Sequence, residues 1–170
     1  MSILPDFEFV LCSDIECIMP EETGTTFEDN AKIKSESGFI KTGIPTLAED
    51  SGLEIDALHG APGIYSARYA QTPQKAIERV LNEMNNIKKR KARFVCVTSF
   101  TDNTGTHIFK GVLEGEIANE QKGSGGFGYD PIFLYDENHT TAQLSTEEKD
   151  AISHRGKALR AFKEWIYDKG

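Results

Sequence analysis

The sequence predicts a mixed α/β protein in which helices flank one sheet. Segments with alternating apolar residues, typical of strands, are interspersed with segments that carry apolar residues at helical spacing. Two long extended segments, 92–101 and 107–117, are joined by the turn-forming residues 102–105, which favours an antiparallel hairpin. This combination indicates an α/β or an α+β domain built on a mixed sheet, and 170 residues fit one domain spanning 1–170.

Composition and charge narrow the classes of function. The chain carries a net charge of -8, so we expect no nucleic acid polymer as a partner. No apolar run is long enough to cross a membrane, and the first residues, MSILPDFEFV, lack the features of a secretory signal, so we expect a cytoplasmic protein without membrane contact. The three cysteines form no CxxC pair and the four histidines have no metal-ligand spacing, which argues against structural disulfides and zinc.

The first elements are a strand and a helix. Residues 7–12 (FEFVLC) are typical of a strand. A helix follows, with Thr25 or Thr26 as its N-cap because an acid lies three residues further on, the spacing of a capping box. We expect this helix to end before Thr42-Gly43, since glycine readily takes the left-handed conformation past a helix end.

Two acids in the middle of the chain, Glu49 and Asp50, follow an apolar segment that reads as a strand. Ser51-Gly52 reads as a turn, after which the alternating pattern resumes, so we expect a hairpin with both carboxylates at a strand end. A carboxylate held by a strand beside a glycine suits catalysis, whereas the alternative is a polar hairpin corner. Asn30 and Lys34 lie four residues apart and share one face of the preceding helix.

The second half of the chain begins with a helix at Thr72-Pro73, whose apolar stripe we assign to the core. The glycine-rich segment 122–130 (KGSGGFGYD) leads into a strand at 131–134. Its glycines indicate either a ligand close to the backbone or merely a turn. Ser145 opens a short helix, and we expect Ser153 to cap a final helix that runs through Trp165.

Several strings, taken together and in this order, resemble the inosine triphosphate pyrophosphatase family: PEETGTTFEDNAKIK, AEDSGLEIDAL with GAPGIYSARYA, ARFVC, GSGGFGYDPIF and STEEKDAISHRGKAL. The match extends from about Pro20 to the C-terminus. The resemblance implies a hydrolase that cleaves non-standard purine nucleoside triphosphates (ITP, dITP, XTP) to the monophosphate and pyrophosphate and so cleans the nucleotide pool. It also implies an elongated mixed sheet with flanking helices that form two lobes around a central cleft, usually in a homodimer.

The resemblance also assigns roles to individual residues. Glu22 and Asp50 are similar to the acids that bind Mg²⁺ in the family. Asp50 also resembles the family residue that accepts a proton from the attacking water. The other matches are substrate contacts: Ser51 beside that acid, then Lys34 and Arg68 with Asn30 in support for the triphosphate, and Phe127, Gly128, Tyr129, Asp130, Lys149, His154 and Arg155 for the nucleobase. These roles agree with elementary chemistry, because Mg²⁺ prefers oxygen ligands and phosphoryl transfer depends on positioning and charge stabilisation. Any one of these motifs alone would fit a structural role equally well, and their joint occurrence is what favours function.

Selectivity for 6-keto purines follows from hydrogen-bond chemistry. Arg155 and Lys149 donate hydrogen bonds and cannot accept them, so either one facing the 6-position would favour hypoxanthine or xanthine. An adenine amino group in the same place would leave donors facing donors, which costs about 1 to 3 kcal/mol for each unpaired group. Guanine shares the 6-keto group, and the sequence does not identify what excludes it.

The chain departs from the family pattern before about residue 20. Family members begin with a strand and a phosphate-binding loop of the form T-x-N-x-x-K, which this sequence lacks, so we expect a domain shortened at its N-terminus. Two interpretations stay open: an active pyrophosphatase, or a catalytically impaired remnant that binds nucleotide or dimerises. A related hydrolase acting on pyrimidine or modified nucleotides is a third, which the GFGYD and SHRGK strings disfavour.

Overall fold

The computed structural model describes residues 3–15 and 17–169, and the chain divides into two compact units. The first unit comprises Met1–Asp50, Cys96–Gly111 and Arg155–Gly170, and the second comprises Ser51–Val95 and Val112–His154. The sheet has the order β1-β2-β3-β4, with β1 at Thr46–Ile55, β2 at Lys91–Asp102, β3 at Gly105–Ile117 and β4 at Phe133–Leu134. The α/β fold class is confirmed, with antiparallel strands. That the whole chain is a single domain stays a prediction.

The helices are α1 (Phe27–Thr42), α2 (Pro73–Glu83), α3 (Thr146–Ile152) and α4 (His154–Asp168). Helix α1 begins where the sequence predicts and ends at Thr42, one residue beyond the predicted end. The Thr26 hydroxyl accepts a hydrogen bond from the backbone N–H of Asp29, and Gly43 takes a left-handed conformation at φ 69°. Helix α2 follows a Thr72 N-cap and α3 follows a Ser145 capping box, so these predicted helix starts are confirmed. The predicted Ser153 cap of α4 stays a prediction.

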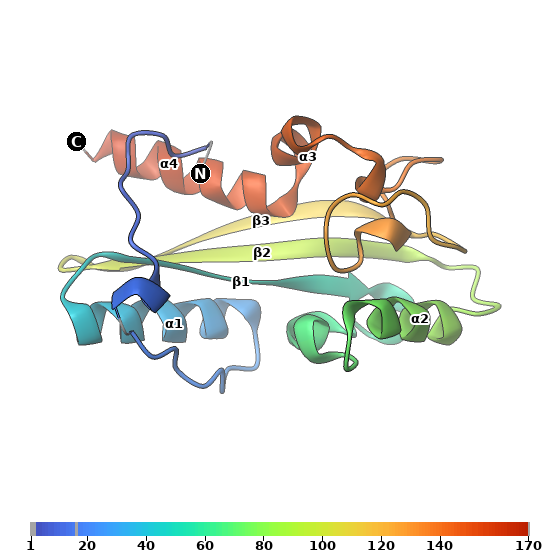
Figure 1. The fold of residues 1–170 in the computed structure, drawn as a ribbon, viewed down its shortest axis with the longest axis horizontal. Helices are drawn as coiled ribbons and strands as arrows, with labels where there is room; N and C mark the ends of the chain where they lie inside the picture. The colour runs from blue at the N-terminus through green and yellow to red at the C-terminus, as the bar shows by residue number, and fades with distance from the viewer. Residues whose placement is uncertain (1–2, 16, 170) are drawn as a thin grey trace. The chain divides into compact units, whose positions relative to one another are not determined.

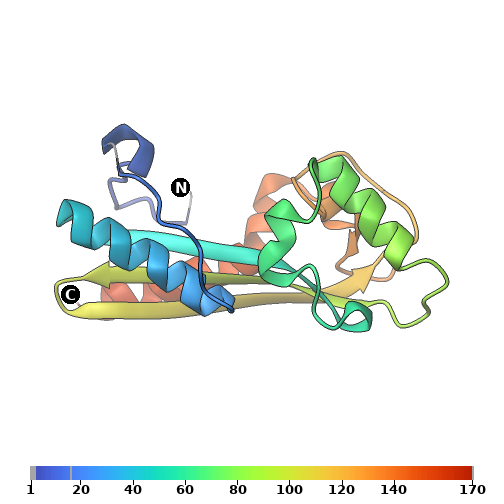
Figure 2. The same cartoon turned by 90° about the horizontal axis from the view of Figure 1, so that it is seen from below.

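In the first unit, α1 and α4 lie on opposite faces of the sheet (Figure 1 and Figure 2). Residues of β2 alternate between these faces, as in any strand. The Ser35 hydroxyl of α1 lies 2.7 Å from the Ser99 hydroxyl and 2.8 Å from that of Thr101. Between them, Phe100 points the other way, and its ring centroid lies 5.1 Å from that of Phe162 on α4. The α1 face of this unit is therefore held by buried hydroxyl groups, and the α4 face by aromatic packing.

The second unit has its own apolar core. The predicted stripe of α2 supplies Ile77 and Val80, which pack in one cluster with Leu53 of β1 and with Phe133 of β4. Strand β4 pairs with β3 in an antiparallel register in which Ile117 faces Phe133. The strand expected at 131–134 is thus shorter than predicted, because Asp130–Ile132 forms a 3-10 turn before it.

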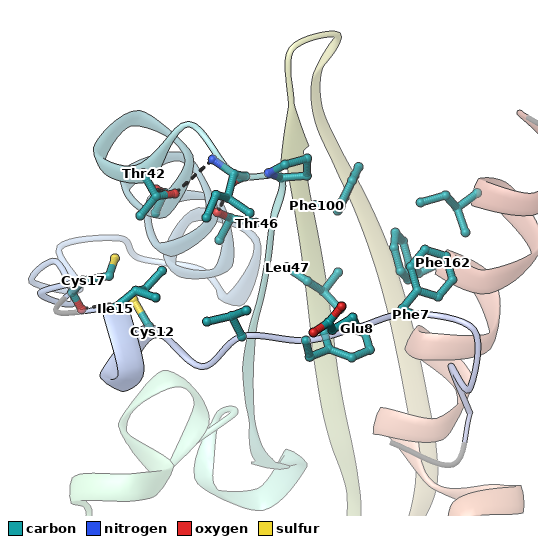
Figure 3. Close-up of a pocket in the computed structure, with 16 residues that line it drawn as sticks. Phe7, Glu8, Cys12, Ile15, Cys17, Thr42, Thr46, Leu47, Phe100 and Phe162 are labelled. Carbon is teal, nitrogen blue, oxygen red and sulfur yellow. Dashed lines mark hydrogen bonds between the residues drawn. The ribbon is translucent and has the colours of Figure 1, made fainter.

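The strand predicted at residues 7–12 is wrong. Residues 7–11 lie outside the sheet, and a short 3-10 helix occupies Cys12–Ile15. The alternating apolar pattern reflects β propensity, but a strand also needs a partner, and in the described part of the chain no strand pairs with this segment. Val10 and Leu11 stay 55% and 61% exposed as a result. A hollow of about 450 Å³ lies beside it, with Phe7, Leu47 and Phe162 among its lining residues (Figure 3).

The hairpin predicted at Ser51-Gly52 is also wrong. Residues 46–55 form one continuous strand, so Glu49 and Asp50 lie in its middle rather than at its end. Ser-Gly is a common turn pair, but β2 is twelve residues long and offers β1 a partner along its length. Ladder hydrogen bonds to that partner outweigh the local turn preference. The hairpin predicted between 92–101 and 107–117 is confirmed as β2 and β3.

Candidate active site

In the first unit, the side chains of Glu22, Lys34 and Asp50 meet in one cluster. The Lys34 ammonium donates to Glu22 Oε1 at 2.7 Å and to Asp50 Oδ1 at 3.0 Å. The Lys34 side chain is only 9% exposed, whereas Glu22 and Asp50 are 26% and 11% exposed. The two carboxylates therefore converge on a single cation-binding point, and the three groups together carry one net negative charge.

Asn30 joins this cluster to the loop before α1. It is fully buried, and its Oδ1 accepts the backbone N–H of Gly24 at 2.9 Å. Its Nδ2 donates to Asp50 Oδ2 at 3.4 Å, opposite the oxygen that Lys34 holds. The expectation that Asn30 and Lys34 share one face of the helix is confirmed, since both reach the same carboxylate. Asn30 orients Asp50 from one side while it holds the loop on the other.

Burial and charge pull the pKa values of this cluster in different directions. Burial lowers the pKa of Lys34, but the hydrogen bonds and charges of Glu22 and Asp50 outweigh burial and hold that pKa above its ordinary value. Lys34 is therefore a cation at neutral pH. Burial raises the pKa of Asp50 above the usual aspartate value, against the opposing effect of Lys34. An efficient proton acceptor has a pKa near the working pH, and a raised pKa brings the carboxylate closer to that value.

The donor chemistry of the cluster fits a divalent cation. Glu22 and Asp50 offer the hard oxygen ligands that such cations take, and their common point already accommodates the positive charge of Lys34. Across the described residues, three or more acidic, cysteine or histidine side chains nowhere gather into a metal-binding group. The protein would thus supply two ligands here, which suits Mg²⁺ because it usually keeps waters and phosphate oxygens as its other ligands.

On the other side of β1, Glu49 binds Arg155. The Nε of Arg155 lies 2.9 Å from both carboxylate oxygens of Glu49, and its Nη2 donates to Oε1 at 2.5 Å. The family resemblance implies a role for Arg155 and none for Glu49. The signal that could have found Glu49 is strand alternation: consecutive residues of a continuous strand point to opposite faces, so two adjacent acids cannot serve one cluster.

In the second unit, Asp130 organises the glycine-rich segment. Its side chain is 3% exposed. Its Oδ2 accepts the backbone N–H of Phe127 at 2.7 Å and a hydrogen bond from the Lys149 ammonium, and its Oδ1 accepts the Thr141 hydroxyl at 2.7 Å. A Cβ added at Gly126 would lie 2.2 Å from the same carboxylate, and this glycine has a φ of 73°. The glycines expected to allow a close backbone approach thus make room for a buried carboxylate.

Phe127 projects from this turn as an exposed aromatic platform. Phe127 is 62% exposed, and the Lys149 ammonium lies 4.6 Å from the centroid of the Phe127 ring. An exposed ring held beside a cation is suited to stack on a planar base. Phe127, Asp130 and Lys149 are therefore brought together as predicted, although what they bind stays a prediction.

Other predicted residues occupy different surroundings. Tyr129 is buried and its hydroxyl donates to the Ser66 carbonyl at 2.9 Å. Burial is the main cause that raises the pKa of Tyr129 to about 12, so it is a neutral phenol. His154 is buried and stacks on Phe94 at 4.9 Å. Arg68 ends a 3-10 helix, with its guanidinium 5.3 Å from the ring centroid of Tyr65.

Two predicted residues have backbone features that bear on their roles. Ser51 follows Asp50 directly in β1 and is half-buried. Gly128 has a φ of 59° and nothing within 4 Å of an added Cβ, so its requirement for glycine is conformational. The substrate contacts of both residues stay predictions.

These features define a mixed α/β protein with a carboxylate–lysine cluster suited to a divalent cation and phosphate. The profile of the Ham1 family matches residues 2–165, and the chain belongs to this family. A dITP/XTP pyrophosphatase of Staphylococcus epidermidis is 46% identical over 157 aligned residues, and the match covers 89% of this chain and 80% of that protein. The resemblance to the inosine triphosphate pyrophosphatase family is confirmed.

Solved structures give the same result. The Ham1 protein of Staphylococcus aureus matches with a TM-score of 0.93 and 43% identity, over 99% of this chain and 91% of that one. A HAM1 protein of Coxiella burnetii matches with a TM-score of 0.93 and 41% identity, over 98% and 90% of the two chains. Pyrophosphatases of this family generally depend on a divalent metal. None of the helices in the described residues has the length and apolar character that a membrane span requires.

Proposed function

We propose that this protein is a nucleoside triphosphate pyrophosphatase that hydrolyses the non-standard purine nucleotides dITP, ITP and XTP to the monophosphate and pyrophosphate. The observation that carries the proposal is the convergence of Glu22, Lys34 and Asp50 on one point in a chain 46% identical to a dITP/XTP pyrophosphatase. The partner would be a purine nucleoside triphosphate, and the biological role would be sanitation of the nucleotide pool.

In the proposed mechanism, Glu22 and Asp50 would hold Mg²⁺. The ion would offset negative charge on the phosphate oxygens. Asp50 accepts the proton of a water whose oxygen forms a bond to the α-phosphorus while the α–β anhydride bond breaks and pyrophosphate leaves. Lys34 exchanges its carboxylate partners for phosphate oxygens, with Arg68 as a second cation and Asn30 keeping Asp50 oriented. Ser51, next to Asp50, contacts the substrate.

We assign base recognition to residues of the strings GSGGFGYDPIF and STEEKDAISHRGKAL. Phe127 stacks on the purine, while either Lys149 or Arg155 offers a donor to its 6-keto oxygen. Asp130 fixes the turn that carries Phe127, which supports this assignment through its contacts to Phe127 and Lys149. The remaining predicted contacts are Gly128, Tyr129 and His154. The buried position of Tyr129 favours a role in shaping the glycine-rich segment 122–130.

The test is a substrate and product profile with Mg²⁺ present. We expect pyrophosphate, rather than inorganic phosphate, from dITP, ITP and XTP at rates well above the rate with ATP. Equal rates on ATP, or release of orthophosphate, would contradict the proposal. Binding of ITP without any product would instead support the nucleotide-binding alternative, and preference for a pyrimidine triphosphate would support the related hydrolase.

We further propose a cytoplasmic homodimer. The nucleotide pool that the enzyme would clean lies in the cytoplasm. The first unit exposes several large apolar side chains, among them Leu11 at 61%, Ile18 at 78% and Ile40 at 81%, which supports a contact with another copy. Sedimentation analysis at micromolar concentration should give twice the mass of the chain, and a monomer would contradict the proposal.

A further inference from the structure

The pair formed by Glu49 and Arg155 is a fork. Two guanidinium nitrogens, Nε and Nη2, donate to one carboxylate at 2.5 to 2.9 Å, across 106 positions of sequence. A contact of this kind fixes the plane of the guanidinium group as well as its position, which a single point contact with a lysine would not do. Glu49 therefore determines how the Arg155 side chain is presented.

The carboxylate is itself anchored from the protein interior. The Cys96 thiol donates to Glu49 Oε2 at 3.8 Å, and Cys96 is fully buried. Burial, with the charge of Glu49 second, raises the pKa of Cys96 to about 12, so the thiol keeps its proton and remains a donor. Glu49 is thus held between a buried thiol of β2 and the guanidinium of α4.

The pair lies outside the proposed metal cluster. Asp50 points to Lys34 and Asn30 of α1, whereas Glu49 points to α4. The two side chains of the pair are 35% and 38% exposed, so solvent partly screens the ion pair and limits what it adds to stability. The three hydrogen bonds at this position are better explained by the orientation they impose on the Arg155 guanidinium than by the stability they add to the fold.

We propose that Glu49 is a positioning residue that holds the guanidinium of Arg155 in the orientation that recognises a 6-keto purine, and so sets the preference for inosine over adenosine nucleotides. This inference rests on the proposed function, and of its two candidate donors to the keto oxygen it takes Arg155. An arginine held in place loses less side-chain entropy when it binds than an unrestrained one. Glu49 does not need to touch the nucleotide for this effect.

The experiment compares Glu49→Gln with the unaltered protein, using dissociation constants for ITP and ATP from calorimetry and steady-state kinetics on both. Glutamine keeps the size of the side chain but loses the charge and the second acceptor. We expect the ITP dissociation constant and KM to rise roughly tenfold with little change in kcat, and the ATP constants to stay the same. The ITP to ATP preference should therefore fall by about the same factor.

A matched control is Glu54→Gln on the same strand. Glu54 is 31% exposed and pairs with Arg93 at 3.4 Å. The substitution therefore removes an ion pair of similar exposure that has no proposed role in recognition. This variant should keep the ITP to ATP preference. In an Arg155→Lys background, where the fork is absent, Glu49→Gln should have no further effect on the preference, as expected for two residues that act as one unit.

Three outcomes separate the hypotheses. An unchanged ITP to ATP preference in folded Glu49→Gln would overturn the positioning role while leaving the proposed function intact. Absence of any ITP preference in the unaltered protein would instead count against the proposed function itself. If Glu49→Gln does not fold, Glu49→Asp replaces it: its carboxylate is one methylene shorter and cannot keep all contacts, so an unchanged preference there would equally overturn the role.

Discussion

At the scale of single residues, neighbours in β1 serve different partners. Asp50 faces Lys34 of α1, and Glu49 faces Arg155 of α4. The two faces of β1 therefore carry different groups. The face toward α1 carries a cluster suited to a cation and phosphate, and the face toward α4 carries the guanidinium of Arg155. A pair of adjacent acids in a sequence suggests a single dicarboxylate site, and a continuous strand rules that out.

Replacement of Lys34 by methionine tests the cluster directly. The change removes the cation between Glu22 and Asp50, and with it the proposed donor to phosphate oxygens, so we expect kcat/KM for dITP to fall about 100-fold. Lys32→Met is the matched control, since Lys32 lies on the same helix, is 52% exposed and pairs with Glu36. Steady-state pyrophosphate release measures both, and a loss below about threefold in Lys34→Met would contradict the assignment.

The buried thiol gives a prediction that does not depend on activity. All three cysteines are thiols, of which Cys12 and Cys17 are half-buried and Cys96 is buried. Burial raises the pKa of Cys96 from 9.0 to about 12, so at pH 8 a thiol reagent should modify two cysteines in the folded protein and three in denaturant. Rapid modification of Cys96 in the folded state would contradict this environment.

The sign of the corresponding pH effect on stability follows from the same shift. The folded state binds the thiol proton more tightly than the unfolded state does, so the contribution of Cys96 is fully present below pH 9.0 and is lost as the pH rises toward about 12. Denaturant unfolding across that range should show a larger loss of stability in the unaltered protein than in Cys96→Ala, which has no thiol to ionise. Equal losses would argue against the shift.

At the scale of elements, the sequence predicted what depends on local contacts and missed what depends on partners. The starts of α1, α2 and α3 were predictable because a Thr or Ser cap bonds to residues three positions away. The strand at 7–12 and the turn at Ser51-Gly52 were mispredicted because sheet formation depends on a distant partner. The first segment has none in the described chain, and β1 has one along its length.

The pairing of β3 with β4 gives the prediction at this scale. A Cβ at Gly115 would lie 2.2 Å from the carbonyl oxygen of Leu134 and 2.7 Å from the Phe133 ring, so the two strands approach too closely for any side chain there. Gly115→Ala should cost about 3 kcal/mol of unfolding free energy, near the upper end for overpacking. The exposed neighbour Glu114→Ala should stay within about 0.5 kcal/mol. Urea denaturation measures both, and equal stabilities would contradict the pairing.

At the scale of the whole molecule, the family strings predicted the members of the cluster correctly. They did not predict the contacts that those residues make. Glu22, Asn30, Lys34 and Asp50 were named from sequence and meet in one cluster of the first unit. Physical pattern alone could not have joined Glu22 to Asp50, because no local rule connects a loop acid with a strand 28 positions away. The contacts of Glu49 with Arg155 and Cys96 were missed for the converse reason: they form only when β1, β2 and α4 are packed together.

The central claim is that Asp50, with Glu22, drives hydrolysis of a purine nucleoside triphosphate. Its most direct test is the rate of pyrophosphate release from dITP in Mg²⁺ by Asp50→Asn, beside Asp56→Asn as a control acid that pairs with Arg93 at 2.8 Å. Loss of the proton acceptor and of a metal ligand should lower kcat by about 10³-fold or more in Asp50→Asn and leave Asp56→Asn near the unaltered rate. A folded Asp50→Asn protein that releases pyrophosphate at the unaltered rate would contradict the claim.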